Sequence, residues 1–447
     1  MRRRGAIFLL AFLLSVVVNA QFLRDFSGLS EEVFSSPTGR AFLQAYGALK
    51  AGYLNETDDE VLLQGAIEGM LGALEDPYTS YATPEQAAQD AENRSGSFEG
   101  IGAVLQPRNR ATDTVVEVIN VYSGSPAEEA GVQVGDIFVE VDGVDVQEAT
   151  TQEIVRMVRG PAGSEVRLGF RRPGVEGVVY ITVTRGSIAI VDVESTVLEG
   201  GVGYLSISSF ANERVHDQLT EQLENLKARG ITSLILDLRN NGGGLLDQGV
   251  RVADEFLSEG DIVFQRARGV TQRLATADPA WFDLPMVVLV NRNSASASEI
   301  VAGALQDNGR ATVIGEETFG KGVGQSVVSL SNGGQLVYLS FEWLTPSRRS
   351  INEQGITPDV LIEDALLSDV LTLQGQGARP GQTIEIVVDG EVVGTAEIDD
   401  EGNFTFFQPL NNRPDSAVQG EALVDLEADT ILRRAHHELL SLQAQAR

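Results

Sequence analysis

The segment from residue 202 to residue 305 alternates between strand and helix patterns, and this alternation constrains the fold more than any other feature. Three short apolar runs have the character of strands, at residues 202–207, 233–238 and 286–291. Each is followed by a helical pattern, at residues 214–228, 245–257 and 297–305. Strands that alternate with helices imply an α/β layer structure for this part of the chain.

The flanking regions have different patterns, and 447 residues are too many for one compact core, so two or three domains are expected. Residues 41–54 and 60–74 have apolar residues at helical spacing. From residue 97 short strands and turn residues follow one another, with one helix at 151–158. A small antiparallel β unit is expected at 380–408, and a last helix at 426–443.

The first twenty residues have the composition of a secretory signal. Arginines at positions 2 to 4 precede an apolar run at 5–18, and small residues lead to Ala20. An uncleaved membrane anchor is the alternative, whereas a lipoprotein anchor is excluded because no cysteine follows. We therefore expect an exported protein of the periplasm or cell envelope, free or tethered to the membrane through its N-terminus.

Composition excludes several kinds of chemistry. The formal net charge of −31 argues against nucleic acid as a partner, because phosphate binding needs clustered cations. Without cysteine there is no thiol nucleophile, thiolate zinc site or disulfide. His436 and His437 are expected to be solvated, and His216 on its helix is not expected to be catalytic. No cofactor and no metal is expected.

Two clusters in the α/β part could stabilise or carry out a nucleophilic attack. A glycine-rich turn at 240–244 follows a strand, and its backbone N–H groups suit an anion, although an ordinary tight turn is the alternative. Ser294, Ser296 and Ser298 lie between a strand and a helix. Helix capping explains one serine there, but three serines in five residues exceed what one cap needs.

A third cluster holds Lys321 between two glycines. The chain has 33 Lys and Arg residues, of which only Lys50, Lys227 and Lys321 are lysine. A chain that uses arginine almost everywhere else suggests a task for Lys321 that arginine cannot perform, namely losing its proton. A desolvated lysine can act as general base to a serine. A surface lysine in a loop is the alternative.

Together these clusters resemble the carboxyl-terminal processing peptidases, or tail-specific proteases. The resemblance rests on SASASEIVAGALQDNGR at 294–310 and GEETFGKGVGQ at 315–325. It implies a crotonase/Clp-protease-like α/β (α+β) catalytic core in which Ser296 is the nucleophile, Lys321 its general base and Gln325 the residue that orients the lysine. The backbone N–H groups of Gly243 and Ala297 would then form the oxyanion hole. Asp307 matches a family aspartate and is expected to be structural.

The β-rich segment resembles the PDZ domain that this family carries as an insertion. The match covers FEGIGA at 98–103, GSPAEEAGVQVGD at 124–136 and VRGPAGSEV at 158–166. It implies capture of a substrate C-terminus, with the carboxylate held by the loop Gly100, Ile101 and Gly102. Ile154 and Val158 would line the side-chain pocket, with core packing as the alternative. Arg159 aligns with a family arginine that is thought to link PDZ position to activity.

The chain is thus expected to contain six segments: a signal or anchor at 1–20, a helical region at 21–95, a PDZ domain at 96–186, a Ser–Lys protease core at 187–365, an inserted β module at 366–415 and a C-terminal helix at 416–447. Gly242 departs from the family, which often has proline there. The expected function is an endopeptidase acting near free apolar C-termini of exported or misfolded proteins, alone, as a homo-oligomer or with an adaptor. A non-catalytic PDZ adaptor and a crotonase-type thioester enzyme are the alternatives.

Overall fold

The computed structural model describes residues 29–109, 113–122, 124–279 and 282–362, the backbone of four strands between 370 and 409, residues 424 and 426, and residues 429–445. The chain forms two compact units, Met1–Tyr81 and Ala82–Arg447. The expected signal at 1–20 lies outside the described residues. Of the helices that the structure describes, none combines the length and the apolar character that crossing a bilayer requires.

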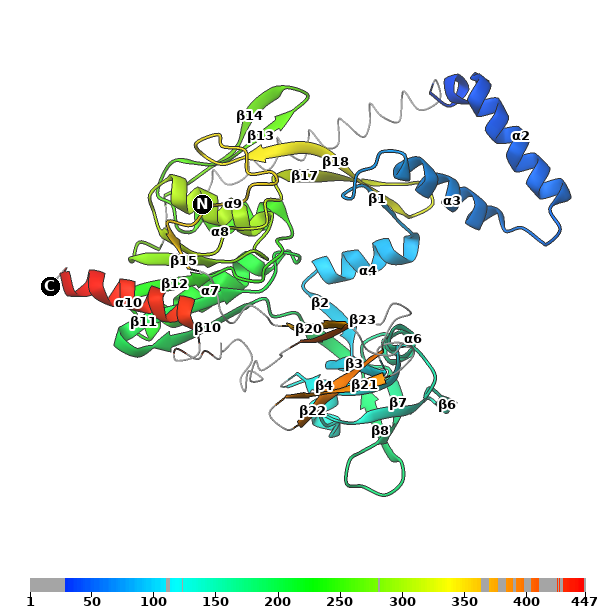
Figure 1. Ribbon diagram of the computed structural model, residues 1–447, viewed down its shortest axis with the longest axis horizontal. Helices are drawn as coiled ribbons and strands as arrows, with labels where there is room; N and C mark the ends of the chain where they lie inside the picture. The colour runs from blue at the N-terminus through cyan, green and yellow to red at the C-terminus, as the bar shows by residue number, and fades with distance from the viewer. Residues whose placement is uncertain are drawn as a thin grey trace. The chain divides into compact units, whose positions relative to one another are not determined.

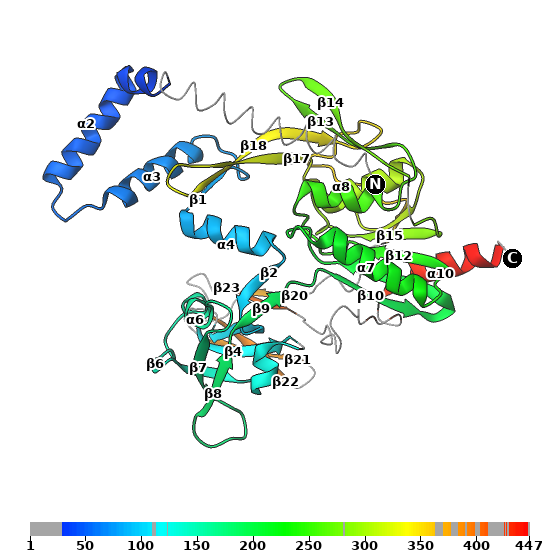
Figure 2. The same cartoon turned by 180° about the vertical axis from the view of Figure 1, so that it is seen from behind.

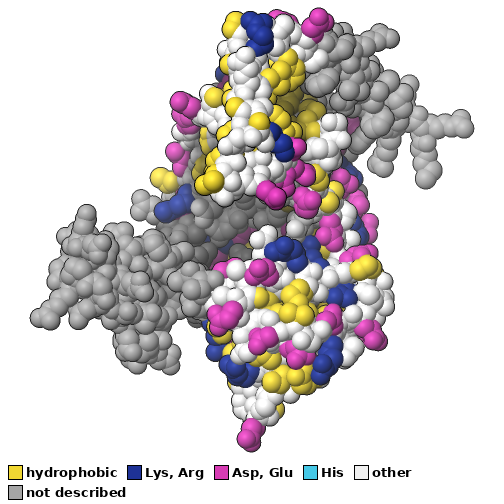
Figure 3. All heavy atoms as spheres, turned by 90° about the vertical axis from the view of Figure 1, so that its right-hand side faces the viewer, with side chains coloured by type: hydrophobic (Ala, Val, Ile, Leu, Met, Phe, Trp, Pro, Cys, Tyr) yellow, Lys and Arg dark blue, Asp and Glu magenta, His cyan; other side chains and the backbone are white. Residues whose placement is uncertain are grey.

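The first unit contains two helices, α2 (Pro37–Gly52) and α3 (Asp59–Gly72), as the helical spacing predicts. Ser36 caps α2 by accepting a hydrogen bond from the amide of Gly39, and Asp58 caps α3 in the same way. Many large apolar side chains on both helices remain exposed: Phe42, Leu43, Leu49, Val61, Leu63 and Met70. Figure 3 draws hydrophobic side chains in yellow.

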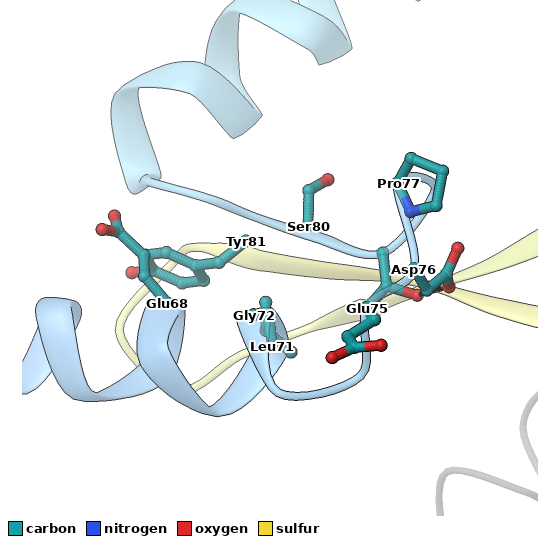
Figure 4. A pocket seen from close by; sticks show the side chains of 9 residues that line it. Glu68, Leu71, Gly72, Glu75, Asp76, Pro77, Ser80 and Tyr81 are labelled. Carbon is teal, nitrogen blue, oxygen red and sulfur yellow. Dashed lines mark hydrogen bonds between the residues drawn. The ribbon is translucent and has the colours of Figure 1, made fainter.

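A pocket in the first unit lies where α3 ends, and three acidic side chains line it (Figure 4): Glu68, Glu75 and Asp76. Asp76 accepts hydrogen bonds from the amide of Tyr78 and the hydroxyl of Thr79, which fixes the turn that breaks the helical pattern. None of the residues that line this pocket belongs to the predicted catalytic clusters.

The second unit contains the predicted α/β layer structure, built on one six-stranded sheet. In spatial order its strands are β10 (Val193–Leu198), β11 (Val202–Ile207), β12 (Ser233–Asp237), β15 (Met286–Val290), β16 (Thr312–Gly315) and β19 (Val360–Leu361). β10 and β11 are antiparallel, and all other neighbours are parallel. The carboxyl ends of β12 and β15 are therefore adjacent, which brings the glycine-rich turn next to the serine segment.

Helices cover both faces of this sheet because its strands alternate two sets of apolar side chains. Leu234 and Leu236 of β12 belong to the core under α7 (Val215–Ala228), α8 (Leu246–Asp254) and α9 (Ala297–Asp307). Ile235 belongs to a second core, formed with Ile431 and Leu439 of α10 (Thr430–Gln445). Figure 1, and Figure 2 from behind, show these helices around the sheet.

An antiparallel sheet accompanies the α/β layers. It contains β13 (Asp261–Ala267), β14 (Val270–Thr276), β17 (Val323–Ser329) and β18 (Gln335–Leu344), and β17 pairs with β18. Lys321 lies directly before β17, and Gln325 lies within it. This sheet therefore carries the lysine cluster.

The PDZ segment is a small sheet with two helices around its own core. The sheet contains β3 (Ala103–Asn109), β4 (Thr114–Val121), β5 (Ile137–Val141), β6 (Val144–Asp145), β7 (Glu165–Arg171) and β8 (Val179–Thr184), and the helices are α5 (Pro126–Ala130) and α6 (Thr151–Val158). β2 (Ser97–Gly100) pairs with β9 (Gly186–Ala189) at the two ends of the segment. Phe138 and Phe170 pack edge to face in the core, so the segment has a hydrophobic core of its own.

Further elements precede and follow the segments described so far. β1 (Ser80–Ala82) and α4 (Pro84–Arg94) precede the PDZ segment. Within the expected β module, β20 (Val370–Gln376) pairs with β23 (Asn403–Pro409), and β21 (Thr383–Val388) pairs with β22 (Glu391–Glu397). Both pairings are antiparallel, as the alternating pattern at 380–408 predicts for the strands that it covers.

Candidate active site

Ser296 lies in a strained turn between β15 and α9. Its backbone has φ 57° and ψ −113°, a conformation that is costly for any residue with a side chain. The neighbouring serines have structural roles: Ser294 Oγ donates to the carbonyl of Leu238 at 2.8 Å, and Ser298 Oγ donates to the carbonyl of Asn241 at 2.8 Å. Both are fully buried, whereas Ser296 is partly exposed. Of the three serines, Ser296 is the one whose setting suits a nucleophile.

The glycine-rich turn approaches Ser296 so closely that a side chain at Gly243 would not fit. A Cβ on Gly243, which has φ 92°, would lie 2.6 Å from the carbonyl oxygen of Ala295 and 2.9 Å from the amide nitrogen of Ala297. The two predicted oxyanion-hole residues are therefore neighbours. The amide of Gly243 itself donates to Asn241 Oδ1 at 2.9 Å.

Lys321 is held by the two glycines beside it and by Gln325. Side chains at Gly320 and Gly322 would collide with the backbone of residues 352–355, so glycine permits this close approach. Lys321 Nζ donates to Gln325 Oε1 at 3.2 Å. Burial lowers the pKa of the Lys321 ammonium below its usual range, which favours the neutral amine that a general base requires.

The carboxylate of Glu299 joins the serine turn to the lysine loop. Its Oε2 accepts the amide of Ser296 at 2.7 Å and the amide of Lys321 at 2.9 Å. Its Oε1 accepts the amide of Gly320 at 2.7 Å and the hydroxyl of Thr318 at 2.5 Å. Because one oxygen binds both amides, the backbones of Ser296 and Lys321 must lie side by side.

Glu299 was not among the site residues that the sequence predicted. Burial raises the pKa of its carboxyl, and the hydrogen bonds from Thr318 and the three amides oppose that shift. The three amides can only donate, so their hydrogen bonds favour the ionised form of the carboxyl group. The Ser-x-x-Glu spacing of Ser296 and Glu299, which is typical of a capping box, is the signal that could have revealed it.

The other acidic and basic candidates have structural roles. Asp307 accepts the amide of Ser347 at 3.0 Å and pairs with Arg349 at 3.0 Å. Burial alone would raise its pKa, but these partners and Thr345 lower it. His216 contacts Glu255 and Arg251 of the α8 region instead of the dyad.

The expectation that His436 is solvated was wrong. It is buried on α10, and its Nε2 lies 2.7 Å from the carbonyl oxygen of Glu199.

The predicted peptide-binding residues lie around one end of the PDZ sheet. Gly102 has φ 80°, and a Cβ there would lie 2.4 Å from Ser125 Cβ. Among the described residues, the amides of Ile101 and Gly102 have no hydrogen-bond acceptor. Two buried amides without acceptors are what a carboxylate loop offers before its ligand binds.

Two further predicted residues on α6, Ile154 and Val158, are buried in the PDZ core. Arg159 follows α6, pairs with Glu92 of α4 at 2.8 Å and lies 5.1 Å from the ring centre of Phe98. Arg159 therefore connects the PDZ helix to the segment through which the chain enters the domain.

Comparison with known proteins gives three matches to family models. Peptidase family S41 matches residues 201–362, a PDZ domain matches residues 117–172, and the activating protease CtpB N-terminal domain matches residues 30–86. The S41 match contains every predicted catalytic residue. Arg159 and the two α6 residues lie within the PDZ match, whereas the loop at 100–102 precedes it.

Several curated proteins are similar over most of their length. The chain is 33% identical to the carboxy-terminal processing protease CtpA of Bacillus subtilis, covering 81% of this chain and 78% of the relative. It is 34% identical to the carboxy-terminal-processing protease of Bartonella bacilliformis (84% and 85%) and 39% identical to the carboxyl-terminal-processing protease of Synechocystis sp. (68% and 71%). Among solved structures, the photosystem II D1 C-terminal processing protease is 32% identical over 72% of this chain and 86% of that chain, with a TM-score of 0.43.

Proposed function

Because the chain belongs to the carboxy-terminal processing proteases of peptidase family S41, we propose that its serine peptidase reaction uses Ser296 as nucleophile and Lys321 as general base. The observation that carries this proposal is the shared oxygen of Glu299, which binds the amides of both residues. The strained backbone of Ser296 and the lowered pKa of Lys321 support it further.

In this mechanism neutral Lys321 removes the proton of the Ser296 hydroxyl as the oxygen attacks the scissile carbonyl. Gln325 accepts from Lys321 Nζ and so directs the amine. The resulting ammonium protonates the leaving amine, and the acyl-enzyme is then hydrolysed by water through the same base.

The amides of Ala297 and Gly243 would stabilise the negative oxygen of the tetrahedral intermediate. Since the Gly243 amide is bound to Asn241 Oδ1, the turn must rearrange locally before it can donate to substrate. Gly242 is exposed and has open space around it, which is compatible with such a rearrangement.

The PDZ domain would capture the substrate tail before cleavage. The amides of Ile101 and Gly102 offer donors to a terminal carboxylate, and Ile154 and Val158 would form the apolar floor of the adjoining groove. Arg159 would link the position of the PDZ domain to peptidase activity, since it contacts Glu92 in the segment through which the chain enters the domain. The six segments named above would be the functional divisions of the chain.

We also propose that residues 1–20 direct export, and that the enzyme acts in the periplasm or cell envelope on proteins with free apolar C-termini. The basic, apolar and small-residue order of this segment supports export. Cell fractionation with sequencing of the mature N-terminus tests it. A start at Gln21 in a soluble fraction supports cleavage, whereas membrane-bound protein with an intact N-terminus supports the anchor.

A serine-directed phosphonate tests the catalytic assignment against a non-catalytic adaptor. Wild-type protein should be labelled once per chain, and Ser296→Ala should not be labelled although it folds and still binds the substrate tail. Ser258→Ala, at an exposed serine, is the control and should be labelled like wild type. Labelling of Ser296→Ala, or none of the wild type, would overturn the assignment of the nucleophile.

A further inference from the structure

Arg239 forms a buried charge cluster at the point where the glycine-rich turn begins. Its guanidinium binds Asp237 at 2.6 Å from Nη2 to Oδ2. The same group binds Asp429 with two hydrogen bonds, at 2.9 Å from Nη1 to Oδ1 and at 2.7 Å from Nη2 to Oδ2. The exposed fraction of the Arg239 side chain is only 11%. One cation is therefore shared between two carboxylates that are far apart in the sequence.

Each carboxylate is anchored in a different element. Asp237 ends β12 and also accepts the hydroxyl of Tyr204 at 2.8 Å. Asp429 lies immediately before α10, where it accepts the amide of Leu432 at 2.8 Å in the manner of a helix N-cap. The helix that Asp429 caps packs against the sheet face opposite to α7, α8 and α9.

Arg239 directly precedes the glycine-rich turn at residues 240–244, which contains Gly243 and is called the oxyanion turn below. Asn240, the next residue, has φ 57°, and its amide donates to Asn291 Oδ1 at 3.0 Å. Asn241 then accepts the amide of Ala295 at 3.0 Å. The turn is thus tied to the serine segment on one side, and its start is held by the Arg239 cluster on the other.

We propose that Asp429 is a positioning residue for the peptidase reaction, which holds Arg239 and thereby the oxyanion turn at residues 240–244. The inference rests on the proposed function, because it assumes that the Gly243 amide stabilises the intermediate. Without Asp429 two N–H groups of a buried guanidinium would lose their acceptors, a loss that burial makes costly. Arg239 would then turn toward water and displace the start of the turn.

Asp429→Asn separates this role from helix capping. Asparagine caps helices as well as aspartate does, so the bond to Leu432 is kept, whereas Arg239 loses the negative charge and one acceptor. We expect kcat for a fluorogenic peptide to fall about 10- to 100-fold with KM within about twofold, because a small misplacement of oxyanion donors acts on the transition state. Binding of a peptide aldehyde, whose adduct with Ser296 places an oxygen in the hole, should weaken by the same factor.

Glu438→Gln is the matched control, because Glu438 pairs with Arg434 on the exposed face of the same helix. It should leave kcat, KM and aldehyde binding unchanged. A folded Asp429→Asn enzyme with the kcat and aldehyde affinity of wild type would overturn the inference, as would a change in KM alone. An inactive wild-type enzyme would instead contradict the proposed function.

Chemical rescue gives a second test that does not depend on the asparagine variant. Asp429→Ser keeps a capping hydroxyl and leaves space for a small anion beside Arg239. Sodium formate, compared with sodium chloride at equal concentration, should restore kcat at least about threefold, since the missing carboxylate is replaced. Equal activity in the two salts would overturn the inference.

Discussion

Substitution of Glu299 should reveal how the two halves of the dyad are held together. In Glu299→Gln one oxygen is kept and the other becomes an NH₂ group. The retained oxygen can still accept the amides of Ser296 and Lys321, while the NH₂ group faces Thr318 and Gly320. The Thr318 hydroxyl can reverse and accept, but the Gly320 amide is left facing a second donor.

The structure sets the size of this effect. One buried amide without an acceptor costs about 1–3 kcal/mol, so Glu299→Gln should remain folded with lowered stability. In Glu299→Ala the three amides lose their acceptor, and roughly three times that cost is expected. Activity should fall by about tenfold in the glutamine variant, and it should be lost in the alanine variant because nothing then aligns Ser296 with Lys321.

The pH dependence gives the sharpest assay. Glu299 binds the backbone amide of Lys321, and a nearby carboxylate favours the charged form of a lysine, so we expect Glu299→Gln to lower the pKa of Lys321 further. The rising limb of kcat/KM against pH should therefore move to lower pH relative to wild type, with thermal unfolding measured in parallel. A limb that stays in place or moves to higher pH would refute the view that an ionised Glu299 acts on the dyad.

Four further predictions concern the base, the pH profile, the turn and the substrate tail. Lys321→Arg should abolish turnover because arginine stays protonated, whereas Lys50→Arg and Lys227→Arg should be nearly silent; a folded Lys321→Arg enzyme with most of its activity would contradict the assignment of the base. For wild type, kcat/KM should rise with pH through one limb below 10.5, since burial lowers the pKa of Lys321, and a pH-independent rate would contradict this. Gly243→Ala should abolish activity because its Cβ would collide with the serine turn, and Gly242→Ala, where nothing lies within 4 Å, should retain it; similar rates for the two variants would show that close approach is not required. Amidation of a peptide substrate's C-terminus should raise KM by about tenfold or more, and an unchanged KM would indicate recognition outside the carboxylate loop.

The α/β core could be predicted because the residues buried in its helices are those that the helical spacing of the sequence places on one face. The helix expected at residues 214–228 is α7, whose buried residues Val215, Leu219, Leu223 and Leu226 follow helical spacing. The helix expected at 151–158 is α6 with the same bounds, because Thr150 and Glu153 form a capping box. Such elements are specified by residues close together in the chain.

The antiparallel sheet that carries Lys321 was not predicted. Most of the side chains of β14 are exposed, so it has no alternation of apolar and polar residues to reveal a strand. The pairing of β17 with β18 depends on contacts between two separate segments, and no local pattern of residues predicts those contacts. Lys321 itself could be found because its amino-acid type is rare in this chain.

The site residues divide in the same way. Ser296 and Lys321 belong to contiguous motifs, so the resemblance identified them, and Glu299 had at least a local spacing signal. Asp429 had none, since its contact with Arg239 joins residues 190 positions apart. Local motifs thus indicate candidate reactive groups, while the groups proposed to position them are found only from the tertiary structure.

The way in which these parts are joined explains which substitutions should separate chemistry from folding. The serine turn, the lysine loop and the oxyanion turn come from different parts of the chain. Buried side chains hold them together by accepting hydrogen bonds from backbone amides. Asn241 accepts the amide of Gly243, Asn291 accepts that of Asn240, and Glu299 accepts the amides of three residues. In the proposed mechanism the reactive groups are those of Ser296 and Lys321, whose backbone amides Glu299 binds. Replacing a reactive group leaves these hydrogen bonds intact, so the chain should still fold and bind substrate. Replacing one of the side chains that accept these hydrogen bonds leaves buried amides without acceptors, so stability and kcat should fall together.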